Sequence, residues 1–419
     1  MRGRVRAVVP RPGGAPEWQL PSTDVTYLDH AATTPMRPEA VAAFTAVLTD
    51  AGNASSLHAG GRRARRIVEE SRESLAEVLG ARPSDLIFTA GGTESDNLAI
   101  KGLYWSRRAA DPRRRRILVS AVEHPAVLDT ASWLARRQGA VLETLPVDET
   151  GLVAPEVLRA AVESDPASVA LVSVMWANSE VGTIQPVAEL ARVAHARDIP
   201  FHTDAVQAFG QIETSFAASE ADALTISAHK IGGPVGVGAL LVRRGVEVEP
   251  LAHGGGQERD VRSGTLNTPG VAAFAAAAAA VTAELPAERV RLASLRDDLV
   301  RRVLAEVPGA TLNGAAPGAG RLPGNAHLTF PGCEGDSLLM LLDAHGVECS
   351  TGSACSAGVA RPSHVLLAMG AGEAHARGSL RFSLGHGSSA ADVDALVAVI
   401  GPVVARASRA GELAGLSAG

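Results

Sequence analysis

Lysine is almost absent from this chain, and one of its two lysines stands where an amine could do chemistry. Lys101 and Lys230 are the only lysines among 419 residues, and the remaining Lys/Arg-type charges are all arginine. A lysine amine can lose its proton and form a Schiff base, which a guanidinium cannot do. Lys230 comes shortly after the apolar run 223–227 and just before Gly232-Gly233-Pro234, which reverses the chain. A place at the end of a buried strand favours a Schiff-base lysine over one more surface charge.

Other apolar runs also end in polar side chains. The runs 86–89, 117–120, 169–174, 201–204 and 224–227 are typical of buried strands. In a sheet of parallel strands that alternate with helices, ligands bind beyond the carboxyl ends of the strands. We therefore expect the side chains that follow these runs to share one crevice; they are Gly92, Thr93, His124, Asn178, Asp204, Gln207, Ser227, His229 and Lys230.

These groups together suit pyridoxal 5'-phosphate (PLP). Gly92 and Thr93 open a helix whose free N–H groups could hold a phosphate, although Gly-Gly-Thr is also an ordinary turn with a threonine cap. The Asp204 carboxylate would pair with a pyridinium nitrogen and make the ring an electron sink. His124 could lie over the ring and exchange protons. Gln207 and Asn178 could donate hydrogen bonds to the phenolate oxygen of the ring.

The order of helical and extended segments predicts an α/β fold with a doubly wound, mainly parallel sheet and a smaller α+β domain. A closing strand at 237–242 is expected to be antiparallel, because no helix separates it from the preceding strand. The pattern changes near residue 275, after which a helix at 283–306 leads to two strands and a further helix. We divide the chain into a flexible tail (1–24), a large domain (25–275) whose first strand leans on the small domain, the small domain (276–405) and a second tail (406–419).

Composition limits the classes of function. A net charge of −6 argues against a nucleic-acid-binding protein, and 46% hydrophobic with 20% charged residues suits a soluble enzyme. Three cysteines without a Cys-x-x-Cys pair favour a reducing compartment. The longest apolar stretch, 270–283, is alanine-rich and too short to span a bilayer. No signal peptide is recognised at the N-terminus, so we expect a cytoplasmic protein without a membrane partner.

Nine segments in a fixed order carry a resemblance to a known family. They are Tyr27 to Pro35, Thr93 to Asn97, Glu123-His124, Asp204 to Gln207, Ser227 to Lys230, Gly254 to Glu258, Arg262 to Thr265, Ser350 to Cys355, and Arg381 to Ser383. The chain resembles the PLP-dependent cysteine desulfurases of the iron–sulfur-cluster type, which are fold-type I PLP enzymes of the class V aminotransferase group. Two departures are visible, since the Asn53-Ala54 pair lacks a common proline and Asn178-Ser179 replaces a usual Asn-Asn pair.

The resemblance implies a role for each candidate residue. Lys230 would carry the cofactor and remove the α proton of the substrate, and Arg381 and Asn178 would hold the substrate carboxylate. Thr265 would reach the phosphate bound by a neighbouring subunit, which implies a homodimer. The phosphate ligands within the chain would be Gly92, Thr93, Ser227 and His229. Arg381 alternates with Leu380 and Phe382 in an apolar strand, so it points into a cleft or into water.

Cys355 distinguishes between reactions. The segment 352–358 has no bulky side chain, so this thiol can move and stay exposed, whereas Cys333 and Cys349 are expected to be structural. The resemblance implies that Cys355 takes the sulfur of L-cysteine as a persulfide, that alanine leaves, and that a sulfur acceptor or an iron–sulfur scaffold protein is the partner. No metal site is expected beyond transient ligation of an iron–sulfur cluster by Cys355.

Other readings stay open at this point. A selenocysteine lyase would share the same residues, while an aminotransferase would give no reason for the cysteine-bearing segment. A non-catalytic scaffold that binds sulfur carriers is a third reading, against which the complete set of Lys230, Asp204, His124 and Cys355 argues.

Overall fold

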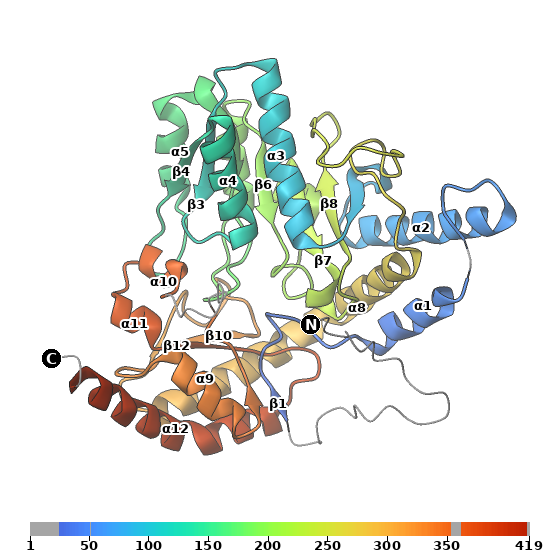
Figure 1. Ribbon diagram of the computed structural model, residues 1–419. Coiled ribbons are helices and arrows are strands. Elements are labelled where there is room, and N and C mark those ends of the chain that lie inside the picture. The colour runs from blue at the N-terminus through green and yellow to red at the C-terminus, as the bar shows by residue number, and fades with distance from the viewer. Residues whose placement is uncertain (1–24, 51, 353–361, 417–419) are drawn as a thin grey trace, which may run out of the picture.

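A seven-stranded sheet forms the larger part of the molecule (Figure 1). The computed structural model describes residues 25–50, 52–352 and 362–416, with side chains up to residue 409. In the order of the sheet, the strands are β2 (Leu86–Thr89), β8 (Gly238–Val242), β7 (Ala223–Ser227), β6 (Phe201–Asp204), β5 (Val169–Ser173), β3 (Arg116–Ser120) and β4 (Val141–Leu145). The five strands from β7 to β4 are parallel, and β8 is antiparallel to both β7 and β2. The prediction of a doubly wound, mainly parallel sheet with an antiparallel closing strand is confirmed.

Helices cover both faces of this sheet because both faces are apolar. Successive side chains of a strand point to opposite faces, so Ile117 and Val119 pack with α3 (Gly92–Ala110) and α4 (Pro125–Gln138). Leu118 belongs to the hydrophobic cluster of the other face. The helices of that face are α2 (Ala59–Val78), α5 (Pro155–Ser164), α6 (Val187–His195), α7 (Phe216–Ser219) and the first half of α8 (Thr268–Glu306). Strand β4 was not foreseen, because its burial pattern is mostly intermediate or exposed and its sequence VLETL is less apolar.

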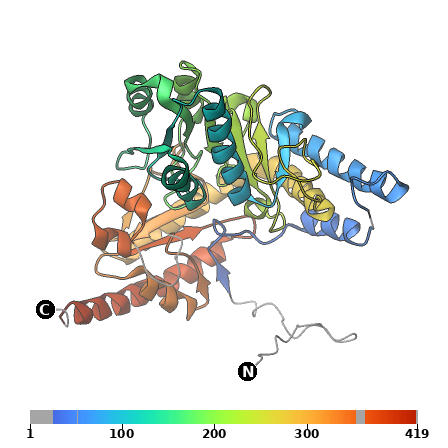
Figure 2. The same ribbon diagram turned by 45° about the horizontal axis from the view of Figure 1, so that its top comes forward.

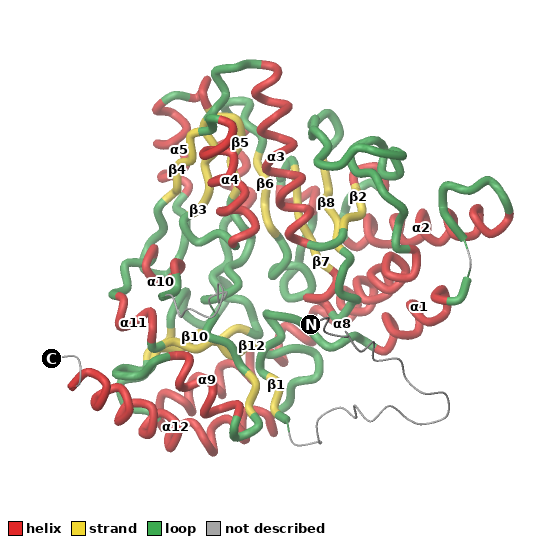
Figure 3. Tube along the Cα trace, viewed as in Figure 1, coloured by secondary structure: helices red, strands yellow, loops and turns green. Residues whose placement is uncertain are grey.

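A second hydrophobic cluster lies beneath the first (Figure 2). Its sheet has the antiparallel order β12 (Ser379–Ser383), β10 (Asn325–Thr329) and β9 (Thr311–Leu312). The short strand β1 (Thr26–Tyr27) pairs with β11 (Val347–Glu348), and the adjacent Leu28 is buried in this cluster. The remaining helices are α1 (Pro38–Leu48), α9 (Gly335–Asp343), α10 (His364–Ala368), α11 (Glu373–Arg377) and α12 (Ala390–Leu416), as Figure 3 shows.

Two helices are longer than the sequence predicted. Helix α8 runs unbroken from Thr268 to Glu306, through the proposed boundary near residue 275, and buries residues in both clusters. By length and composition it could cross a membrane, a test that the core helix of a globular protein also passes. Helix α12 extends to Leu416, so the prediction of a flexible tail is wrong for residues 406–416. Alanine-rich sequence is a strong helix former, which explains both extensions.

Candidate active site

A cavity of about 870 Å³ lies at the carboxyl ends of the parallel strands, between the large sheet and the smaller one. The wall on the side of the large sheet comes from the loops after β2, β3, β5, β6 and β7. The wall on the other side comes from β12 and from the segments on either side of residues 353–361. The predicted site residues that line this cavity are Gly92, Thr93, His124, Asp204, Gln207, Ser227, His229, Lys230 and Arg381.

Lys230 presents its amine to this cavity from the short 3-10 helix Ala228–Ile231, which follows β7. Its Nζ donates to the main-chain oxygens of Ala31 at 2.6 Å and Ala32 at 2.8 Å. Burial, and then the nearby Arg381, lower the pKa of Lys230 to about 8, against the opposite effects of Asp204 and Asp29. About a tenth of this amine is therefore unprotonated at pH 7 and able to act as a nucleophile or a base.

The amino end of α3 and the end of β7 form a cradle for an anion. Gly91 has φ +150°, a conformation that residues with a side chain rarely adopt, and no side chain caps the first turn of α3. A Cβ on Gly92 would come 3.0 Å from Val206 Cγ2, so only glycine fits without a shift. Ser227 Oγ is buried and has no hydrogen-bond partner among the described residues. Free N–H groups and an unpaired hydroxyl suit a phosphate.

Two carboxyl groups lie close together at the floor of the cavity. Asp204 Oδ1 accepts a hydrogen bond from the N–H of Val206 at 2.8 Å. Burial raises the pKa of Asp204, whereas His124 and Lys230 lower it. Burial and then the charge of Asp204 raise the pKa of Asp96 well above its usual value. Asp204, whose pKa is lowered by His124 and Lys230, is the carboxylate that can pair with a cation such as a pyridinium nitrogen.

His124 caps the amino end of α4 and faces the cavity. Its Nδ1 accepts a hydrogen bond from the N–H of Ala126 at 3.1 Å, which places the proton of the neutral ring on Nε2. Burial lowers the pKa of His124, while Asp204 raises it. The preceding Glu123 is fully buried, and burial raises its pKa to about 8. The neutral His124 ring can therefore donate a hydrogen bond to a ligand in the cavity.

Arg381 brings a guanidinium from β12 to the same cavity. Its Nη2 donates to Asp29 Oδ1 at 2.8 Å and its Nη1 to the main-chain oxygen of Ser179 at 3.0 Å. Nε of Arg381 is buried and has no hydrogen-bond partner among the described residues. A buried, oriented guanidinium of this kind suits a carboxylate.

Two predicted site residues that the structure describes do not line the cavity. Asn178 is buried, its Nδ2 donates to Val122 O at 2.9 Å, and its Oδ1 accepts from the N–H groups of Glu180 and Val181 at 2.9 Å each. The neighbouring Ser179 lines the cavity, and the contact of Asn178 with a ligand stays a prediction. Thr265 is exposed and lies outside this cavity. Cys355 lies outside the described residues.

Sequence reasoning missed several polar residues of the cavity. Asp96, Glu123, Glu180 and His364 all line it, and Ser363 Oγ donates to Glu180 Oε2 at 2.5 Å. Glu123 and Asp96 stand inside segments that carry the family resemblance, so they could have been singled out there. Glu180 and His364 carry no local signal, because only the fold places the loop after β5 beside α10.

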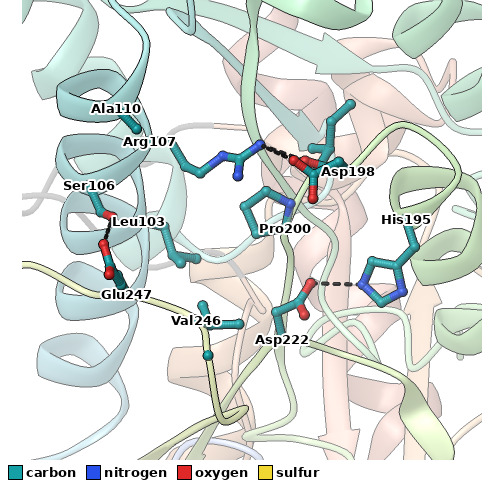
Figure 4. A pocket seen from close by; sticks show the side chains of 12 residues that line it. Leu103, Ser106, Arg107, Ala110, His195, Asp198, Pro200, Asp222, Val246 and Glu247 are labelled. Carbon is teal, nitrogen blue, oxygen red and sulfur yellow. Dashed lines mark hydrogen bonds and ion pairs between the residues drawn. The ribbon is translucent and has the colours of Figure 1, made fainter.

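A second cavity, of about 410 Å³, lies near the amino ends of β6 and β7 (Figure 4). Its polar side chains pair with one another, since His195 Nε2 lies 2.8 Å from Asp222 Oδ2 and Arg107 Nη2 lies 3.2 Å from Asp198 Oδ2. None of the predicted site residues that the structure describes lines it. We assign these pairs a structural role at the edge of the sheet where the parallel strands begin.

Comparisons with known proteins agree with this site. Residues 26–396 match the class-V aminotransferase family. The chain is 58% identical over 386 residues to an IscS-like cysteine desulfurase of Mycobacterium tuberculosis, which covers 92% of this chain and 98% of that protein. It is 42% identical over 379 residues to the cysteine desulfurase IscS of Methanosarcina thermophila, which covers 90% of this chain and 91% of that protein.

Solved structures of similar fold agree with these relatives. The chain is similar to a NifS-like protein with a TM-score of 0.84 and 35% identity, over 91% of this chain and 100% of that one. It is also similar to SspA, solved in complex with cysteine, with a TM-score of 0.74 and 33% identity, over 86% of this chain and 98% of that one.

Proposed function

The chain belongs to the class-V aminotransferase family and is a PLP-dependent cysteine desulfurase, and we propose that it transfers the sulfur of L-cysteine to Cys355 and releases L-alanine. The family resemblance, the fold-type I architecture and the dependence on PLP that the sequence predicted are confirmed. The persulfide on Cys355 is a proposal that rests on the sequence around this residue, which follows the described Thr351-Gly352.

The residues present fit PLP. Ser227 Oγ and the uncapped turn at Gly92 would hold its phosphate, with Thr93 and His229 beside them. Asp204 would pair with the ring nitrogen, and Lys230 is the point of covalent attachment. When bound, PLP supplies an electron sink for charge that develops at the substrate α carbon.

The protein's own groups bind the substrate and move its protons. Arg381 holds the carboxylate of L-cysteine, in the orientation that Asp29 and the main chain of Ser179 give its guanidinium. Lys230 Nζ takes the α proton, since a pKa of about 8 leaves part of the amine free to accept it. His124 offers the N–H of its Nε2 to the bound groups as a hydrogen-bond donor and proton source.

The observation that carries this proposal is the meeting of Lys230, Asp204 and the unpaired Ser227 hydroxyl in one cavity with Arg381 at its wall. The test is to incubate the PLP-loaded protein with L-cysteine and measure alanine and sulfide together. We expect equal amounts of the two with a reductant present, and neither from Lys230→Ala. Sulfide without alanine would point to another reaction and contradict the proposal.

We propose a homodimer with shared sites. Apolar side chains on and near α1 are exposed in the single chain, namely Val41 (44%), Leu48 (57%) and Leu57 (89%), which supports a protein interface there. Figure 1 shows α1 and the far end of α2 projecting from the body.

Mixing Lys230→Ala chains with Thr265→Ala chains tests whether the sites are shared, because each mixed dimer would then contain one complete site and regain activity. If dimers shown to contain one chain of each variant were as inactive as the two variants alone, the sharing of sites would be contradicted.

We also propose a cytoplasmic location and transfer of the sulfur to an iron–sulfur scaffold or another thiolation acceptor. The names of the relatives from M. tuberculosis and M. thermophila support a role of this kind. The described cysteines, Cys333 and Cys349, are both free, as a reducing compartment would leave them. Following radiolabelled sulfur from cysteine into proteins of a cell extract would identify the acceptor.

A further inference from the structure

Three histidines line the active-site cavity, and the rings of two of them, His124 and His364, have opposite hydrogen-bonding polarity. His124 accepts at Nδ1 from a main-chain N–H, so its neutral ring carries the hydrogen on Nε2. The Nε2 of His364 lies 3.0 Å from the main-chain oxygen of Glu123. A carbonyl oxygen can only accept, so His364 carries its hydrogen on Nε2 and leaves a lone pair on Nδ1. Of these two rings, that of His124 is therefore a donor through Nε2 and that of His364 an acceptor through Nδ1.

The ring of His364 is held in place from two sides. Helix α10 begins at His364, and its cap Ser363 accepts a hydrogen bond from the N–H of Leu366 at 3.1 Å. The same Ser363 hydroxyl donates to the buried Glu180 at 2.5 Å. With the bond to Glu123, these contacts fasten the first turn of α10 to the loops after β3 and β5. A side chain that is held by its neighbours in this way is pre-oriented for a ligand.

His364 also lies near the part of the cavity where the substrate carboxylate is expected. Burial raises the pKa of Glu180, whereas Ser363, His364 and Arg381 lower it, so His364 and Arg381 both lie near this carboxyl group. Arg381 would hold the carboxylate of L-cysteine, and His364 and Glu180 line the same cavity. An amino acid as short as cysteine then has its side chain within the region that His364 borders.

Several other groups of the cavity are poor acceptors for a thiol proton. The Nδ1 of His124 already accepts the N–H of Ala126, and Arg381 has no acceptor atom. Burial, and then the charge of Lys230, lower the pKa of His229 to about 4, so this ring is a weak base. Burial raises the pKa of Asp96, and it raises that of Glu123 to about 8. Lys230 is assigned to the α proton.

We propose that His364 is a further catalytic residue, whose Nδ1 accepts the thiol proton of L-cysteine. The S–H bond breaks, its electron pair stays on sulfur, and the proton makes His364 an imidazolium. The proposal rests on the proposed desulfurase function and adds the group that takes the sulfur-bound proton.

The variant His364→Gln tests it, because the glutamine Nε2–H can keep the bond to Glu123 O but offers no base at the position of Nδ1. We expect PLP absorbance and the KM for L-cysteine to stay near those of the wild type and kcat to fall about 100-fold. The kcat of His364→Ala should fall at least as far, and added imidazole should restore part of it. The exposed His345, changed to Gln, is the matched control and should keep full activity.

Two results would overturn the proposal. The first is a kcat of His364→Gln within about twofold of the wild type, since a general base contributes far more. The second is a loss of PLP absorbance in both variants without rescue by imidazole, which would assign His364 to the support of α10 alone. A wild type that makes no alanine from L-cysteine would instead reject the proposed function, and this proposal with it.

Discussion

Arg381, near the end of the chain, is oriented by Asp29, near its beginning: Nη2 of the arginine donates to Oδ1 of the aspartate at 2.8 Å. The loop that follows β1 thus reaches across to β12 and fixes the guanidinium that faces the cavity. The Arg381 side chain is 6% exposed and that of Asp29 22% exposed, so the pair is shielded from screening by solvent. Its contribution should therefore be measurable in substrate binding.

Removal of this partner should weaken binding of L-cysteine. In Asp29→Ala the guanidinium loses a hydrogen bond to a charged group, which is worth about 1.5–3 kcal/mol. We expect the KM for L-cysteine to rise about tenfold or more while kcat changes less than about threefold. Asp29→Asn keeps an acceptor oxygen, so its KM should lie between those of the wild type and Asp29→Ala. A fall in kcat at unchanged KM would mean that Asp29 acts on a chemical step instead.

Attachment of PLP should follow the titration of Lys230. Its pKa of about 8 lies below the usual value of 10.5, and the amine is reactive only when neutral. The neutral fraction rises as the pH rises through the pKa, so the rate at which apo-protein takes up PLP should increase about tenfold between pH 7 and pH 9 and then level off. An unshifted lysine would show a rate that still climbs steeply above pH 9.

The other lysine provides the control for this experiment. Lys101 Nζ donates to Asn97 Oδ1 at 2.8 Å and lies over the Trp133 ring, away from the residues of the cavity. Borohydride followed by peptide mass spectrometry should place the adduct on Lys230 in both the wild type and Lys101→Ala. An adduct on Lys101 in the wild type would show that the cavity does not select its lysine.

The thiol of Cys355 should be required for sulfur transfer but not for PLP binding. Cys355→Ser is expected to keep the absorbance of bound PLP and to release no sulfide from L-cysteine. Cys349→Ser is the matched control, because burial raises the pKa of Cys349 to about 12 and keeps this thiol unreactive. Full activity in Cys355→Ser would reject the persulfide step. A correctly folded but inactive Cys349→Ser would mean that Cys349, and not Cys355, carries the persulfide.

Much of the fold and of the site could be predicted because it depends on local patterns. The apolar runs ending at Asp204 and Ser227 are strands, and the rule that ligands bind beyond such ends located the cavity. Lys230 stood out because lysine is rare in this chain. These inferences need only the periodicity of a strand and the chemistry of one side chain.

What could not be predicted depends on contacts between distant parts of the chain. The amide of Asn178 looked free in the sequence, yet its Nδ2 donates to Val122 O in the loop after β3 and its Oδ1 accepts from the turn that follows it. His364 and Glu180 come together only because α10 packs against the loop after β5. The change of pattern expected near residue 275 falls inside a single helix, since α8 continues from one hydrophobic cluster into the other. No local propensity carries this information.

A buried ion pair should anchor the loop that leads to Thr265. Arg72 on α2 donates to both carboxylate oxygens of Glu258 at 2.8 and 2.7 Å, and Glu258 also accepts from the N–H of Phe88 at 2.9 Å. In Glu258→Ala the guanidinium stays buried without this partner, which should lower the free energy of unfolding by about 3–5 kcal/mol. Denaturant unfolding of the PLP-loaded protein measures the loss. Asp50→Ala, which breaks an exposed pair with Arg63, is the control and should leave the free energy of unfolding nearly unchanged. Equal losses in the two variants would show that burial of the Arg72–Glu258 pair does not matter for stability.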